Sequence, residues 1–276
     1  MLWIIPAIIG SMCGTSVLFI IYFYLYKVEK KNFICIWAIS WFLYIISLVF
    51  TLLLLTHGDF KIYRIGELIF SIISSYFLIK GANEILDKDT NRWLLFIFAL
   101  DILWVIVATL FSMDNMIIVF PTLYMIGIVY IWCGFMIMKA WKQKVFPVYA
   151  VGMSFIIWGL HKMDYPFFRG IEWFAPWGYT ISVALELLIA INFLLMYFQN
   201  IRNELIATQL ILEESEVRLS SIIGNQRDII FELNNEKRFT YVSAASYDIL
   251  GHKYFDVMGK SFYDYIKGDF DIEKFS

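Results

Sequence analysis

Seven continuous apolar runs, separated by short charged loops, fill residues 1–198 and constrain the fold more than any other feature of the sequence. The hydrocarbon layer of a bilayer is ~30 Å thick, so a helix needs about 20 apolar residues to cross it. Five runs have that length, and the third and sixth extend toward it through residues 82 and 163. The predicted spans are Leu2–Tyr26, Phe33–Thr56, Ile65–Lys80, Trp93–Ser112, Ile117–Met138, Val148–Leu160 and Trp177–Phe198. We therefore predict an all-α bundle of seven transmembrane helices.

The composition excludes several classes of protein. Hydrophobic residues make up 61% of the chain and charged residues 17%, against roughly 45–50% and about 25% in soluble domains. A net charge of −2 gives no basic footprint for nucleic acid, and three scattered cysteines give no disulfide framework. The sequence has no phosphate-binding glycine loop, nucleophile elbow or HExxH motif, and no lysine in the seventh span to anchor retinal. We predict no catalytic residue and no metal site, identify no cofactor, and expect a lipid bilayer around the chain.

Lysine and arginine are concentrated in alternate loops between the spans. One set of loops holds nine of them and the other set holds four. Short cytoplasmic loops carry an excess of basic residues. The pattern therefore predicts a multi-pass protein of the cell membrane, with its N-terminus outside and its C-terminus in the cytoplasm.

Residues 199–222 are polar, contain neither glycine nor proline, and carry a heptad pattern. The positions that repeat at alternating spacings of four and three are Ile201, Leu205, Thr208, Leu212, Ser215, Leu219 and Ile222. Such a seam is typical of a parallel two-stranded coiled coil. We predict a signalling helix that pairs in a homodimer; the alternative is a single amphipathic helix that lies on another surface.

Residues 223–276 have the pattern of a small α+β module. Asp228–Asn234 and Phe239–Val242 are rich in β-branched and aromatic residues, and the intervening residues favour a turn. A short helix is predicted over Ala244–Leu250, ended by Gly251, and a further turn is closed by Gly259.

The order of these elements resembles the first half of a PAS domain. The residues that carry the resemblance are Ile229–Phe231, Arg238–Val242, Ser243–Ala245, Ile249–Gly251 and Val257–Lys260. A complete PAS core has further strands, and a half-sheet leaves an unpaired edge. We therefore expect the 276 residues to be part of a longer protein, and no haem or flavin pocket can be argued from this half.

A second resemblance lies before the last span. His161–Phe167 (HKMDYPF) and Glu172–Gly178 (EWFAPWG) are similar to a signature of seven-helix sensor regions that precede PAS domains in prokaryotic histidine kinases and cyclic-di-GMP enzymes. The resemblance implies seven helices at residues 1–198, a signalling helix at 199–222, the beginning of a PAS domain at 223–276, and an effector. The effector would be a histidine kinase of a two-component system or a diguanylate cyclase, and this part of the chain would not itself be an enzyme.

Three carboxylates fall inside predicted spans: Glu67, Asp101 and Glu186. Each costs ~2.5–3.5 kcal/mol in hydrocarbon on insertion scales, so each should face the bundle interior and find a partner. Counting along the helices places Asp101 about 14 Å and Glu186 about 18 Å from the inner surface. We therefore expect these two side chains to meet at one level and share a proton. Glu67 lies near the outer end of its helix, at a depth similar to His161 and Lys162, which could neutralise it.

These positions predict a polar cavity open to the outer side, with the loop His161–Trp177 as its lid. The residues expected to contact a small ligand, a lipid or an ion are Glu67, Asp101, Glu186, His161, Asp164, Trp173 and Trp177. The alternatives are structural polar contacts between helices for the acids, and an interfacial belt for the aromatic residues. A metal site of His161, Asp164 and Glu172 is disfavoured because no cysteine accompanies them.

The function predicted from these features is a membrane-bound sensor. A signal of unknown identity would alter the packing of the seven helices, and the last helix would pass the change to the cytoplasmic side. The alternative is an ion- or proton-coupled transporter, against which the spans show no inverted repeat.

Overall fold

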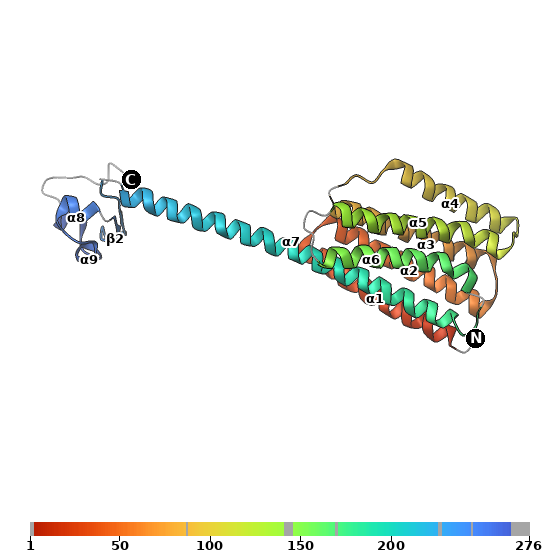
Figure 1. Ribbon diagram of the computed structural model, residues 1–276. Coiled ribbons are helices and arrows are strands. Elements are labelled where there is room, and N and C mark those ends of the chain that lie inside the picture. Colours follow the sequence, from red (N-terminus) through yellow and green to blue (C-terminus); the bar gives the residue numbers. More distant parts are fainter. Residues whose placement is uncertain are drawn as a thin grey trace. The chain divides into compact units, whose positions relative to one another are not determined.

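The structure is a computed structural model that describes residues 3–86, 88–140, 146–168, 171–225, 228–243 and 245–265. Of residues 224, 225 and 248–250 only the backbone is described. The chain divides into two compact units, residues 1–199 and residues 200–276. Each unit is described by itself (Figure 1).

Seven long helices account for most of the described residues, one for each predicted span. They are α1 (Ile4–Glu29), α2 (Asn32–His57), α3 (Lys61–Ile85), α4 (Arg92–Leu110), α5 (Asn115–Ala140), α6 (Phe146–Phe168) and α7 (Ala175–Asn225). Helices that follow one another in the chain pack together, as α1 with α2, α2 with α3 and α5 with α6 do, and α3 also contacts α4 and α5 (Figure 1). The first unit is therefore an all-α bundle.

Six of these helices are long and apolar enough to cross a membrane: α1 to α5 and α7, in a search of the described residues. They make the chain a multi-pass membrane protein. Helix α6 is not among the six, because its last two turns carry His161, Lys162 and Asp164 and lower its hydropathy.

The predicted lid loop over His161–Trp177 is wrong for most of its length. Helix α6 continues to Phe168, with Pro166 buried in its last turn, and α7 begins at Ala175. A proline removes one helical hydrogen bond and its ring clashes with the preceding turn, so Pro166 favours the end of α6 shortly after it. His161 and Asp164 are therefore held on a helix rather than on a loop.

Facing glycines bring α5 and α6 close together. Gly127 lies opposite Gly159, and Gly134 lies opposite Gly152; at each one an added Cβ would come within 3.0 Å of the facing carbonyl oxygen. Small residues at such contacts let helix backbones approach in membranes, where the hydrophobic effect does not drive association.

Hydroxyl groups and indole N–H groups fasten the other helices. On α2 and α3, Ser40 and Ser74 each donate a hydrogen bond to the other's carbonyl oxygen, at 2.8 and 2.9 Å. Trp37 donates from Nε1 to the carbonyl oxygen of Leu78 at 3.0 Å. Helix α7 is fixed to α1 by Tyr22, which donates to the carbonyl oxygen of Ala190 at 2.9 Å. The large side chains exposed on the outside of these helices are mostly apolar, as a lipid-facing surface requires.

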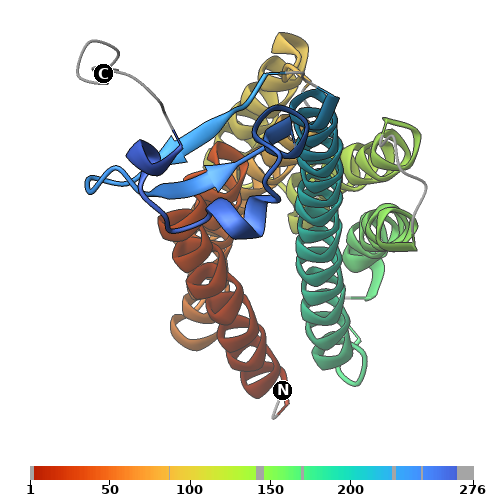
Figure 2. The same ribbon diagram turned by 90° about the vertical axis from the view of Figure 1, so that its left-hand side faces the viewer.

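The second unit contains a two-stranded antiparallel sheet, β1 (Phe231–Leu233) and β2 (Phe239–Val242), seen in Figure 2. Its register pairs Phe231 with Val242, and an irregularity follows Glu232. The remaining elements are α8 (Ala245–Leu250), α9 (Tyr254–Val257) and a 3-10 turn, η1 (Phe262–Asp264). A small core gathers Phe239, Val242, Val257 and Phe262.

The predicted hairpin is confirmed, although β1 is shorter than the run that predicted it. The turn holds because Asn234 accepts hydrogen bonds through Oδ1 from the backbone N–H groups of Glu236 and Arg238, at 3.0 and 2.9 Å. Gly251 and Gly259 have φ of +70° and +77°, the left-handed region that favours glycine. Two strands and short helices are only weakly PAS-like, so the PAS resemblance stays a prediction. Ala244 lies outside the described residues.

Candidate functional site

A polar cavity of about 60 Å³ lies inside the bundle, at the end where α7 begins. Its position follows from the parts of the helices that line it: the later half of α2, the beginning of α3, the first turns of α5, the end of α6 and the first turns of α7. The polar lining residues are Tyr44, Ser47, Thr51, Glu67, Ser71, His161, Lys162, Tyr165, Gly178, Tyr179 and Ser182, and the apolar ones are Leu48, Leu68, Val119 and Leu123. Seven of these residues carry a hydroxyl group.

The volume restricts what this cavity can hold. A cavity needs a volume of about 10–15 Å³ to hold one water molecule, so this cavity has room for about four water molecules. Sites for larger organic ligands measure roughly 300–1,000 Å³. The arrangement seen here suits water, a proton pathway, a small ion or a molecule of a few heavy atoms.

Lys162 supplies a positive charge to the cavity wall. Its Nζ donates a hydrogen bond to the Tyr44 hydroxyl at 3.3 Å, and it lies 5.1 Å from the centre of the Tyr44 ring and 5.2 Å from that of Trp158. Lys162 also interacts electrostatically with Glu186 and Glu67. A cation between two aromatic faces and two acids is stabilised in an interior that would otherwise disfavour it.

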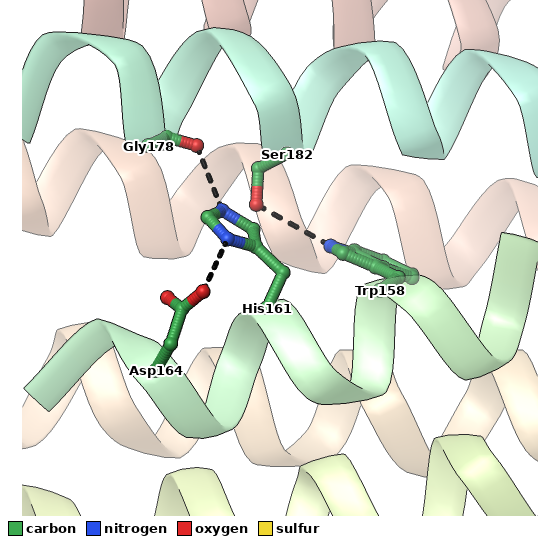
Figure 3. Close-up of polar contacts among 5 residues, drawn as sticks. All are labelled: Trp158, His161, Asp164, Gly178 and Ser182. Atoms are coloured by element: carbon green, nitrogen blue, oxygen red, sulfur yellow. Dashed lines mark hydrogen bonds and ion pairs between the residues drawn. The ribbon is translucent and has the colours of Figure 1, made fainter.

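His161 joins α6 to the first turn of α7 (Figure 3). Its Nε2 lies 3.0 Å from the carbonyl oxygen of Gly178, and its Nδ1 lies 3.3 Å from Oδ2 of Asp164. Both neighbours are acceptors, so only the imidazolium form donates to both, whereas each neutral tautomer donates to one. Trp158 makes a parallel connection, donating from Nε1 to Oγ of Ser182 at 3.3 Å.

Glu186 belongs to the same polar cluster, although it does not line the cavity. This α7 side chain is 1% exposed and accepts a hydrogen bond at Oε2 from the Thr15 hydroxyl of α1, at 3.0 Å. Tyr44 and Lys162 both interact with it electrostatically. Within the described residues its Oε1 has no hydrogen-bond partner. Tyr44 and Lys162 thus line the cavity and also interact with Glu186.

Asp101 lies apart from this cluster. It accepts a hydrogen bond at Oδ1 from the Thr122 hydroxyl of α5, at 3.0 Å, and its Oδ2 has no partner among the described residues. The expected sharing of a proton with Glu186 is therefore wrong, since the free oxygens of the two carboxylates do not bond to each other. The depth along a helix sets the height of a side chain but not the direction in which it points.

Of the seven predicted ligand contacts, the structure brings Glu67 and His161 to the cavity and places Asp164 against His161. Trp173 and Trp177 line a separate, wider depression of about 720 Å³, together with Trp3, Pro6, Ala7, Glu172, Pro176 and Thr180. In the described part of the chain, no three His, Cys, Asp or Glu residues are grouped to hold a metal ion.

Sequence reasoning missed Tyr44 and the hydroxyl residues of the wall, and it treated Lys162 only as a neighbour of Glu67. The sequence could have identified Lys162, because it is a lysine next to His161 inside a predicted extension of the sixth span. Nothing in the sequence distinguishes Tyr44, which is one of 17 tyrosines in a chain of apolar runs.

Comparisons of the chain with models of protein families, with curated proteins and with solved structures found no match. The function is therefore argued from the geometry of the bundle and its cavity.

Proposed function

We propose that residues 1–276 form the input region of a membrane-bound sensor. A proton, an ion or a small molecule that enters the polar cavity would change the contacts of α7 there, and α7 would carry the change along its length. The observation that supports this most is that α7 supplies Gly178, Tyr179 and Ser182 to the cavity wall and continues as one helix to Asn225.

The start of α7 is held by groups that a ligand in the cavity would touch. Its Gly178 carbonyl faces His161, its Ser182 accepts from Trp158, and its Tyr179 hydroxyl lies 2.8 Å from that of Tyr165. A change in the charge of His161 or in the position of Tyr165 would therefore alter the force on this helix end. Where such an interface has two stable arrangements, a small shift at a site becomes a larger movement.

Helix α7 is built to transmit such a movement without bending. Residues 179–223 contain neither glycine nor proline, the usual causes of sharp kinks. An aromatic series also joins the cavity to a later turn of α7: Trp158 stacks on Tyr130 at 4.7 Å, Phe155 follows at 5.8 Å from Tyr130, and Phe193 of α7 lies 6.5 Å from Phe155. Two separate turns of α7 are therefore connected to the same site, and both would respond to a change there.

We also propose that the chain crosses the membrane seven times, with its N-terminus outside. Helix α6 would be the seventh span, since its glycine contacts align it with α5, which is itself apolar and long enough to cross. The excess of basic residues in alternate loops supports an outer N-terminus and a cytoplasmic C-terminus, and hence an outer cavity.

The output would run through a homodimer. Leu205, Leu212 and Leu219 of the predicted seam are each more than half exposed, which leaves them available to a second copy of the chain. Beyond this helix, the hairpin would begin a PAS domain that precedes a histidine kinase or, alternatively, a diguanylate cyclase.

Disulfide crosslinking tests transmission in the full chain, held in membranes and freed of its native cysteines. Leu205→Cys should crosslink rapidly, whereas Leu210→Cys, an exposed position outside the seam, should not. His161→Ala should change the rate at Leu205→Cys, because it removes the contact with Gly178. An unchanged rate would refute transmission, and ion flux through liposomes that Asp101→Asn abolishes would instead support a transporter.

A further inference from the structure

The wide depression at the cavity end of the bundle has an unusual wall. Three tryptophans line it, Trp3 before α1, Trp173 in the α6–α7 connection and Trp177 in α7, and they are 76%, 72% and 60% exposed. Glu172 lines it as well. Three exposed indole rings and one carboxylate thus line a single space of about 720 Å³, which lies within the range of small-molecule sites.

Tryptophans are enriched at both membrane–water interfaces, and exposed tryptophans lie at both ends of this bundle. The depression differs from such a belt in that its tryptophans line one space together with a carboxylate. The other exposed tryptophans of the described residues are Trp93 and Trp132. They lie at the opposite end of the bundle, with their ring centres 6.4 Å apart. At the cavity end, every exposed tryptophan that the structure describes lines the same depression.

The lining specifies the charge of an occupant. Indole faces attract cations more strongly than other aromatic faces do, and a carboxylate adds to that attraction. None of the described lining residues is a lysine, arginine or histidine, so nothing in the described wall would hold an anion.

The lining also specifies the kind of cation. Its described side chains offer few hydrogen-bond acceptors, Glu172 and the hydroxyl of Thr180, whereas a primary ammonium has three N–H groups to satisfy. A quaternary ammonium has no N–H group, so it loses no N–H hydrogen bonds to water when it enters the site. Aromatic cages are a known means of binding such groups.

We propose that Trp3, Trp173, Trp177 and Glu172 bind a choline-type quaternary ammonium group. The group could belong to a phosphatidylcholine headgroup or to a free solute such as choline. The site is distinct from the polar cavity, but Trp177 and Thr180 lie in the same turns of α7 as Gly178 and Tyr179 of the cavity wall. Binding can be measured without any signalling output, so this proposal and the sensor proposal can fail separately.

The experiment uses the 276-residue chain in phosphatidylglycerol nanodiscs, with radiolabelled choline as the probe. Choline should bind saturably, and tetramethylammonium should displace it. The neutral isostere 3,3-dimethyl-1-butanol has the same shape without the charge and should not compete. If phosphatidylcholine added to the nanodiscs displaces choline, the headgroup shares the site; if it does not, the site serves a free solute.

Variants assign the binding to these residues. Trp173→Leu should raise the Kd for choline about tenfold, the ratio that corresponds to ~1.4 kcal/mol, and Trp173→Phe should raise it less because a ring face remains. Glu172→Gln should also weaken binding. Trp132→Leu removes an exposed indole at the opposite end and is the matched control, with an unchanged Kd. Absence of saturable choline binding, equal competition by the neutral isostere, or equal affinity in Trp173→Leu would overturn the proposal.

Discussion

Alanine at Gly134 should open the contact between α5 and α6. Its new methyl carbon would lie within 3.0 Å of the carbonyl oxygen of Gly152 and of Cγ1 of Ile156, so the backbones must separate. Overpacking costs ~1–3 kcal/mol, and a clash with a backbone carbonyl belongs at the upper end of that range. Alanine regains ~1 kcal/mol of helix propensity over glycine. The net loss should be about 2 kcal/mol, or a factor of about 30 in the opening equilibrium.

The neighbouring thiol of Cys133 reports on this opening. It is fully buried, whereas Cys13 is exposed and Cys35 is partly exposed, so both of these are first replaced by alanine. When opening is fast relative to modification, the rate at which a maleimide modifies Cys133 follows the population of the open form. Gly134→Ala should therefore raise that rate about 30-fold in detergent micelles.

Gly10→Ala is the matched control, because nothing lies within 4 Å of the Cβ it adds on α1. It should leave the rate of Cys133 modification unchanged or lower it slightly. If Gly134→Ala behaves like this control, the close backbone approach of α5 and α6 does not exist and the reasoning is refuted.

Three further outcomes are expected. Thr15→Val leaves the Glu186 carboxylate without its hydrogen bond from the Thr15 hydroxyl and should lower the unfolding free energy by ~1–3 kcal/mol; Glu186→Leu should remove most of that effect in a double-mutant cycle, and additive losses would contradict the pairing. Ser40→Ala removes one donor of the reciprocal pair with Ser74. It should lower the free energy of unfolding by ~0.6 kcal/mol, and by about 1.7 kcal/mol at most, which a shift in the thermal midpoint would measure. Leu205→Asp places a charge in the predicted seam and should yield monomers by light scattering in nanodiscs, and a persistent dimer would count against the seam.

The positions of the helices could be predicted because the hydrocarbon layer demands long apolar runs. The ends of the helices could not be predicted, because polar residues continue a helix when they find hydrogen-bond partners. Lys61 begins α3 four residues before the predicted span, and α6 runs on through His161 and Asp164, which bond to Gly178 and to each other. The predicted lid failed for this reason.

The burial of the acids in the membrane spans was predictable, and the arrangement of the site was not. Buried acids were expected to face the interior, and Asp101 and Glu186 do, at 7% and 1% exposure. Their partners, Thr122 and Thr15, depend on the rotation of each helix about its own axis, which a nearly uniform apolar run does not encode. Residues 15 and 186 are 171 positions apart, so no local pattern could have joined them.

The absence of glycine and proline between residues 179 and 223 has a consequence for how this protein can change by insertion or deletion. Each residue added to or removed from a continuous helix turns everything beyond it by about 100°. Seven residues return the downstream part nearly to its starting azimuth, while one or two do not. If α7 transmits a signal as we propose, insertions into it should preserve the output only when they add whole heptads, and a series of single-residue insertions would show a periodic gain and loss of output.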